Sequence, residues 1–123
     1  MKNPVRNLIA LSAPAPDSAA AARAAVLALA QAKDPAGATT EGERVTFTIE
    51  WEPAFKEVKD LSTKFPGVTF TLYGDAFAKQ HWLSKIVYLS GKSSEEATLS
   101  RIDGASFRAL YNEIFGQPFP VGG

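Results

Sequence analysis

Few side chains in this sequence have the type and spacing that catalysis or metal binding requires. His81 is the only histidine, and Asp75 is the one nearby residue that forms a plausible donor pair with it. Because a zinc site needs three or four converging ligands, we interpret His81 as an exposed imidazole in a loop. The chain contains no cysteine, which excludes a thiolate nucleophile, a disulfide and a cysteine-based metal site.

Two carboxylates, Glu50 and Glu52, flank Trp51 at a spacing that places both on one face of a strand. Such a pair can share a proton or bind a cation. We favour a structural interpretation, in which Glu52 caps a helix beside Pro53 and Glu50 lies in solvent. The sequence contains no nucleophile elbow, P-loop, dinucleotide fingerprint or zincin motif. We therefore expect a protein that is not an enzyme and uses no cofactor and no metal.

Two segments that alternate apolar and polar residues with a period of two are predicted to be half-buried strands. The first, residues 45–51, places Val45, Phe47, Ile49 and Trp51 on one face, and the second covers residues 68–73. A helix that begins at Glu52-Pro53 and ends at Pro66-Gly67 connects them. We expect the apolar faces, including Phe47 and Phe70, to be buried beneath helices.

The other face of these two strands is rich in threonine and carries little charge. RNA-binding sheets of similar design carry several aromatic and basic residues on this face, so RNA recognition of that type is disfavoured. The face suits packing beneath a helix over residues 107–114 or against a protein partner, and the sequence leaves both open. The residues predicted to bind a partner are Thr46, Thr48, Glu50, Thr69, Thr71, Tyr73, Asp75 and His81.

The rest of the chain supplies the elements around this pair of strands. In the N-terminal half, the patterns predict a strand over residues 5–11, a helix capped by Asp17 or Ser18 that runs to about Lys33, and a mobile loop over 34–42. After the two alternating strands they predict a turn at Gly74-Asp75, a strand over 82–90, a turn over 91–96 and a weaker strand or short helix over 97–102. The last element is a helix capped by Asp103 and ended by Gly116 and Pro118. The predicted fold is a single α+β domain over residues 1–116, near the order βαβαβββα, with a loose tail over 117–123. It is a two-layer sandwich with a mainly antiparallel sheet and an additional C-terminal helix.

Composition narrows the class of protein further. A chain of 123 residues with 46% hydrophobic content is typical of one compact domain. Thirteen basic and thirteen acidic residues balance, which removes the bulk attraction that general nucleic-acid or membrane binders use. The longest apolar segment, residues 19–30, is mostly alanine and contains Arg23, so it is too short to cross a membrane. We expect no signal peptide and a soluble, cytoplasmic protein.

Two stretches resemble the YubB-like family of ferredoxin-like domains, which are small proteins carried by plasmids and phages. The first is Met1-Lys2-Asn3-Pro4-Val5-Arg6-Asn7-Leu8, similar to the short N-terminal strand of that family. The second runs from Ile49-Glu50-Trp51-Glu52-Pro53 through Leu61-Ser62-Thr63-Lys64-Phe65-Pro66-Gly67-Val68-Thr69-Phe70, similar to its strand, helix and next strand. The family's usual segment before the second stretch is shortened here to a Gly/Ala/Thr loop. The resemblance implies a ferredoxin-like fold of the split βαβ type and a mobile-element origin, and it supplies no reaction.

Together these observations predict a non-enzymatic accessory protein of a phage or plasmid that binds a host or element-encoded protein. Antagonism of a host defence system such as CRISPR-Cas is one form of that role. The alternative is a nucleic-acid-binding module of a mobile element, which would use Lys79, Lys85, Lys92, Arg101 and Arg108. Homodimerisation through a sheet edge or the threonine face is also compatible with the pattern.

Overall fold

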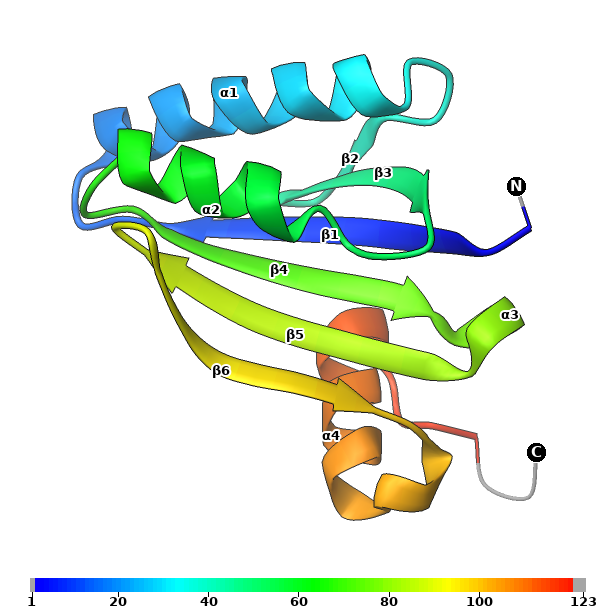
Figure 1. The fold of residues 1–123 in the computed structure, drawn as a ribbon. Coiled ribbons are helices and arrows are strands. Elements are labelled where there is room, and N and C mark those ends of the chain that lie inside the picture. Colours follow the sequence, from blue (N-terminus) through cyan, green and yellow to red (C-terminus); the bar gives the residue numbers. More distant parts are fainter. Residues whose placement is uncertain (1, 121–123) are drawn as a thin grey trace.

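The computed structural model describes residues 2–120, which form one antiparallel sheet with helices against both of its faces (Figure 1). The six strands lie in the order β2-β3-β1-β4-β5-β6. The strands are β1 (Pro4–Ser12), β2 (Thr39–Glu41), β3 (Arg44–Glu50), β4 (Thr69–Ala76), β5 (Trp82–Leu89) and β6 (Lys92–Leu99). The helices are α1 (Pro16–Lys33), α2 (Phe55–Lys64), α3 (Phe77–Gln80) and α4 (Ala105–Phe115), with a 3-10 turn η1 (Arg101–Asp103) before α4.

Strand β1 lies between β3 and β4 and is antiparallel to both of them. Strands β3 and β4 therefore run parallel to each other, with α2 as their connection and β1 inserted between them. The predicted α+β class, antiparallel sheet and C-terminal helix are confirmed. The predicted order βαβαβββα accounts for every long element, and the structure adds the short β2 and α3.

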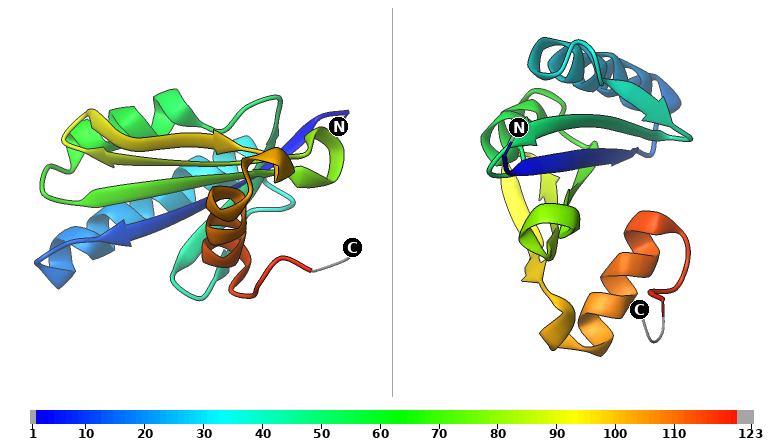
Figure 2. Two further views of the ribbon diagram at one scale, coloured as in Figure 1. Left: turned by 90° about the horizontal axis from the view of Figure 1, so that it is seen from below. Right: turned by 90° about the vertical axis from the view of Figure 1, so that its right-hand side faces the viewer.

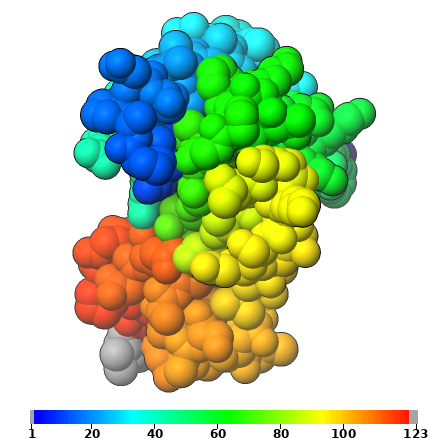
Figure 3. Space-filling view, turned by 90° about the vertical axis from the view of Figure 1, so that its left-hand side faces the viewer, coloured from blue at the N-terminus to red at the C-terminus, as the bar shows by residue number. Residues whose placement is uncertain are grey.

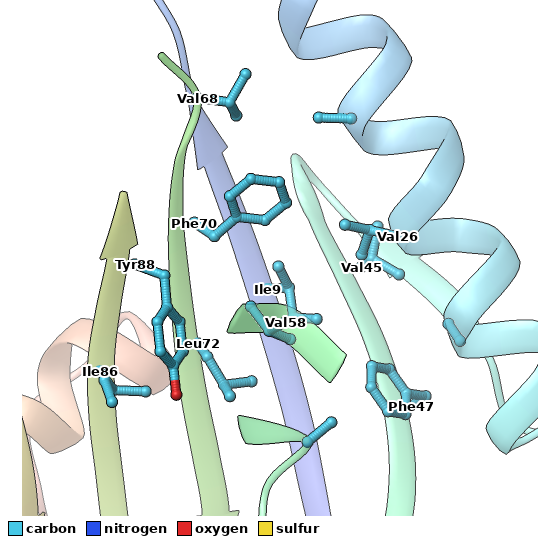
Figure 4. Close-up of a cluster of buried hydrophobic side chains, with 13 residues drawn as sticks. Ile9, Val26, Val45, Phe47, Val58, Val68, Phe70, Leu72, Ile86 and Tyr88 are labelled. Carbon is cyan, nitrogen blue, oxygen red and sulfur yellow. The ribbon is translucent and has the colours of Figure 1, made fainter. Parts of the chain in front are cut away.

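The face of the sheet toward α1 and α2 holds the larger core (Figure 4). Phe47 of β3 and Phe70 of β4 are 1% and 0% exposed, as their alternation with polar residues predicts. Val26 of α1 and Val58 of α2 pack onto this face. Burying side chains of this size stabilises the fold by roughly 1.5–3 kcal/mol each.

Helix α4 packs against part of the opposite face, so the sheet is covered on both sides where α4 crosses it (Figure 2). The sheet contributes Leu8, Tyr73 and Leu83 to this second core. The helix contributes Phe107, Leu110 and Ile114, which recur on one face at the spacing of helical turns. Strands β1 and β4 are consequently buried on both faces at their centres.

The amide of Asn7 joins the middle of the sheet to the start of α2. Its side chain is fully buried; Oδ1 accepts the backbone N–H of Ala54 at 2.8 Å, and Nδ2 donates to the Val5 carbonyl at 3.1 Å. Gly74 lies opposite Asn7 on β4. A Cβ atom there would lie 2.7 Å from Pro53 Cγ and would clash with Ser84 Oγ. The predicted turn at Gly74-Asp75 is therefore wrong, because this glycine lets the loop before α2 pass close over a continuous strand.

Three predicted helix starts are shifted in the structure. Helix α1 begins at Pro16, where a proline costs no hydrogen bond, and Asp17 lies in its first turn. Helix α2 begins at Phe55, after Pro53, because Ala54 is not helical and gives its N–H to Asn7. Gly104 precedes α4, while Asp103 accepts the N–H of Ser100 within η1.

Two segments without apolar alternation are strands. Strand β2 lies in the predicted loop 34–42, and β6 begins at Lys92 inside the predicted turn. Both are edge strands with mostly exposed side chains, so burial imposes no pattern on them. The tail that we expected to be loose is packed at Phe119. The centroid of its ring lies 5.2 Å from that of Phe107 and 5.0 Å from that of Tyr111. Its last part, residues 121–123, lies outside the described residues.

Replacing Asn7 should test how much the fold depends on this amide. Asn7→Ala leaves the buried N–H of Ala54 without its acceptor, which should lower the free energy of unfolding by about 2–3 kcal/mol. Asn112→Ala, on the exposed side of α4, should change that free energy by less than about 0.5 kcal/mol. Urea denaturation of both variants measures the difference, and equal effects would contradict the role given to Asn7.

Candidate functional site

Trp51 is the most conspicuous surface residue of the loop between β3 and α2, with 64% of the residue exposed. The alternation of β3 predicts an inward side chain, and that prediction is wrong. The chain leaves the strand after Glu50, and Trp51 adopts a φ of 77°. This left-handed conformation is unfavourable for a bulky side chain. It turns the indole away from the core.

The backbone around Trp51 is held by Asn3, just before β1. The N–H of Trp51 donates to the Asn3 carbonyl at 2.9 Å, and Gln80 Nε2 donates to the same carbonyl at 3.4 Å. The indole N–H of Trp82 donates in turn to Gln80 Oε1 at 3.3 Å. Together with the bond from Ala54 to Asn7, these contacts tie the loop to the N-terminal half of β1 at two points.

Glu50 stabilises the same end of the sheet from the other side of Asn3. Its Oε1 accepts the backbone N–H groups of Asn3 at 3.1 Å and Lys2 at 2.6 Å. Both bonds lower the pKa of Glu50, and the bond from Asn3 has the larger effect. Glu50 is thus charged and exposed, as is Glu52 on the other side of Trp51 in the sequence.

His81 completes this end of the sheet, where the start of β1, the end of β3 and helix α3 come together (Figures 1 and 2). It ends α3 with a φ of 65°, and its N–H donates to the Phe77 carbonyl at 3.1 Å. The imidazole is exposed and lies perpendicular to the Phe77 ring, with the two ring centroids 6.2 Å apart. We call Glu50, Trp51, Glu52, Gln80 and His81 the Trp51 surface.

The other predicted binding residues lie apart from this end. Thr46 and Tyr73 are 4% and 7% exposed, on the sheet face that α4 partly covers. Thr48 uses its backbone N–H to bind Asp34 Oδ2 at 2.9 Å. The threonines of β4, Thr69 and Thr71, are half-buried.

Asp75 is engaged within the protein rather than presented to a partner. Its Oδ2 lies 3.5 Å from Arg6 Nε, and its Oδ1 accepts the N–H of Phe77 at 3.2 Å. The structure therefore brings Glu50 and His81 to one end of the sheet and leaves the rest of the predicted set on the α4 side.

A polar cluster fastens α4 to the sheet. Glu113 Oε2 accepts the hydroxyl of Tyr73 at 2.6 Å and lies 2.8 Å from Lys85 Nζ, which also pairs with Glu95 at 3.2 Å. Burial, reinforced by Glu113, raises the pKa of Tyr73 to about 12. Partial burial alone would raise the pKa of Glu113, but the bonds from Lys85 and Tyr73 outweigh it and lower that pKa. The hydrogen bond to Glu113 is the main reason that the pKa of Lys85 is raised.

Arg44 holds the C-terminal end of α4, a role that nothing in its sequence neighbourhood indicates. Its guanidinium donates to the carbonyls of Ile114 at 2.6 Å and Glu113 at 2.5 Å, and it stacks on the Tyr73 ring at 4.8 Å. The last carbonyls of a helix have no partner within the helix and attract cations. Arg44 therefore joins α4 to β3 across the sheet.

Within residues 2–120, no group of three or more His, Asp or Glu side chains is placed to hold a metal ion. No helix in the same range has the length and apolar character needed to cross a membrane. Comparisons of the chain with protein-family models, curated proteins and solved structures find no match.

Ionisation of Tyr73 should weaken the fold at high pH. The pKa of about 12 in the folded protein lies above the ordinary value of 10, so folding favours the neutral phenol. The stabilisation is complete below pH 10 and is lost as the pH rises toward 12, by about 2–3 kcal/mol. Denaturation at a series of pH values should show a smaller loss for Tyr73→Phe. Tyr111→Phe, which leaves Tyr73 in place, should lose as much stability at high pH as the wild type.

Proposed function

We propose that this protein acts by binding another protein through the Trp51 surface. The proposal depends on the exposed indole of Trp51, whose backbone has a left-handed conformation. Hydrogen bonds to Asn3 and Asn7 fix the loop that carries it. Tryptophan is enriched among the residues that dominate binding energy at protein interfaces. A loop that is already ordered loses little entropy when it binds.

The charges around Trp51 favour a protein over a nucleic acid as the partner. Glu50 and Glu52 flank Trp51 in the chain, both are exposed, and their carboxylates would repel phosphate groups. Of the basic residues considered for nucleic-acid binding, Lys85 is paired with Glu95 and Glu113. Lys92 begins β6 and Arg101 follows its end, so an eight-residue strand of roughly 25 Å separates them.

The resemblance to the YubB-like family extends the proposal to the biological setting. We propose a cytoplasmic accessory protein of a phage or plasmid whose partner is encoded by the host or the element, with antagonism of a host defence system such as CRISPR-Cas as one form of the role. The arrangement of β3, α2 and β4 around β1 supports a ferredoxin-like fold as the basis of that relationship.

Replacing Trp51 should abolish partner binding without unfolding the protein. Trp51→Asn removes the indole, and asparagine tolerates the left-handed conformation, so the free energy of unfolding should not fall. Affinity for a partner captured from a bacterial host lysate should drop at least about tenfold, as expected for a central aromatic residue. Ile102→Asn is the matched control, since Ile102 is a large apolar residue that is 94% exposed in η1. Equal capture by wild type and Trp51→Asn would contradict the proposal.

A salt series separates the protein-binding proposal from the nucleic-acid alternative. We expect gel shifts with duplex DNA and single-stranded RNA to show no complex at micromolar protein concentration. Phosphate contacts would give an affinity that falls steeply, by about a thousandfold or more for several contacts, between roughly 50 and 200 mM salt. A complex with that salt dependence would favour the alternative.

A further inference from the structure

The ring of Phe119, in the tail that follows α4, lies among other aromatic rings. Its centroid is 5.9 Å from that of Phe77 in α3. It is 5.2 Å from that of Phe107 and 5.0 Å from that of Tyr111, both in α4. All three contacts are edge to face, an arrangement that aromatic pairs prefer. The guanidinium of Arg101, in η1, lies over the Phe119 ring at 5.5 Å. We call Phe77, Arg101, Phe107 and Tyr111 the Phe119 site.

The aromatic residues of the Phe119 site also contact one another. The Phe77 centroid lies 5.5 Å from that of Phe107 and 6.5 Å from that of Tyr111, and Phe107 and Tyr111 are 6.2 Å apart. Phe107 is 1% exposed and belongs to the core between α4 and the sheet. These rings are therefore positioned by their mutual contacts and by that core, so we expect them to stay in place when Phe119 leaves.

One side chain holds residues 117–120 against α4. Gln117, Pro118 and Pro120 are exposed, whereas Phe119 is half-buried. No hydrogen bond joins residues 117–120 to the rest of the described chain, and the two prolines have no N–H to donate. In Figure 3 the red C-terminal residues lie directly against the orange residues of α4. A segment attached in this way opens at a lower free-energy cost than the core.

The sequence around Phe119 indicates which ligand the site accepts. In Gln117-Pro118-Phe119-Pro120, one aromatic residue stands between two prolines. Proline-rich segments dock in grooves lined with aromatic residues, because their extended conformation is largely formed before binding. The edges and faces of the three rings suit another aromatic ring, and Arg101 is attracted to its face. A ligand suited to the site is therefore a phenylalanine flanked by prolines.

We propose that the Phe119 site binds a proline-flanked phenylalanine of a partner protein, and that Phe119 is an internal competitor for the site in the free chain. The inference goes beyond the proposed function, because the Phe119 site shares no residue with the Trp51 surface. A segment on a short tether acts at an effective concentration of millimolar order. A partner must therefore bind more tightly than the tail or make further contacts, so the tail sets a threshold for binding.

Titration of the full chain with the tail's own sequence tests the proposal. The probe is the peptide acetyl-Gln-Pro-Phe-Pro-amide, followed in amide proton–nitrogen spectra, which also report whether each variant is folded. In Phe119→Ala, which removes the competing ring, we expect saturable shifts at the amides of Phe77, Phe107 and Tyr111 with a Kd of millimolar order. The wild type should bind the peptide about tenfold more weakly, because its tail competes. Leu89→Ala, which removes an exposed apolar side chain at the other end of β5, should bind it as weakly as the wild type.

Four comparisons in the Phe119→Ala background define what the site selects. The peptide acetyl-Gln-Pro-Ala-Pro-amide lacks the ring and should give no saturable shifts. The peptide acetyl-Gln-Ala-Phe-Ala-amide should bind severalfold more weakly, since it loses more conformational freedom on binding. Adding Arg101→Gln should also weaken binding severalfold, through the lost cation–π contact. Adding Trp51→Asn should leave binding unchanged, so the titration stands apart from the test of the Trp51 surface.

The proposal would be overturned by unsaturated shifts in Phe119→Ala, by equal binding of the phenylalanine and alanine peptides, or by equal affinity of Phe119→Ala and the wild type. Light scattering tests a second copy of the chain as the occupant, and we expect the wild type and Phe119→Ala both to be monomeric. A wild-type dimer that becomes a monomer in Phe119→Ala would indicate exchange of tails between copies. That result would overturn the assignment of the site to a different protein.

Discussion

The buried amide of Asn7 is the interaction on which the arrangement of this protein depends. A polar side chain at the centre of a sheet is stable only if its groups are paired, and Asn7 is paired with Val5 on its own strand and with Ala54 at the start of α2. The same bond fixes where the connection from β3 to α2 crosses the sheet. Gly74, on the neighbouring strand, leaves the space for that crossing. The outward position of Trp51 follows, because the loop is held at Asn3 on one side and at Asn7 on the other.

Much of this fold could be predicted where burial imposes a pattern. The alternation around Phe47 and Phe70 identified two central strands and their inward faces, because each strand has one face against the helices. Strand β6 was only partly predicted, as a weaker strand or short helix that starts at residue 97 instead of 92, since its side chains are mostly exposed and only its backbone bonds to β5 define it. The glycine at position 74 was misread for a different reason. A turn and a close approach both require glycine, and only the position of Pro53 distinguishes them.

The candidate site was predictable only in part. Glu50 and His81 were singled out separately, but their common location depends on Asn3, whose carbonyl binds both the β3–α2 loop and α3. Trp51 was assigned to the buried face because it continues the period of β3, and a positive φ at tryptophan leaves no signal in a sequence. The attachment of α4 was also beyond prediction. It depends on Arg44 of β3, which binds the last carbonyls of α4, and on the Glu113 carboxylate, which binds Tyr73 and Lys85; these residues are far apart in the chain and meet only because α4 packs against this face of the sheet.

The edges of the sheet indicate which modes of association the structure favours. An exposed edge strand can pair with another chain through its backbone, and proteins limit this with short strands, charges and bulges. Strand β2 has only three residues. Strand β6 is longer, but its pairing with β5 is irregular between Lys85 and Val87, Glu95 there has a φ of 53°, and Glu95 and Glu96 add negative charge. Sheet extension is thus disfavoured at both edges. Under the proposed function, the contact with a partner would be made by side chains such as that of Trp51 rather than by addition of a strand.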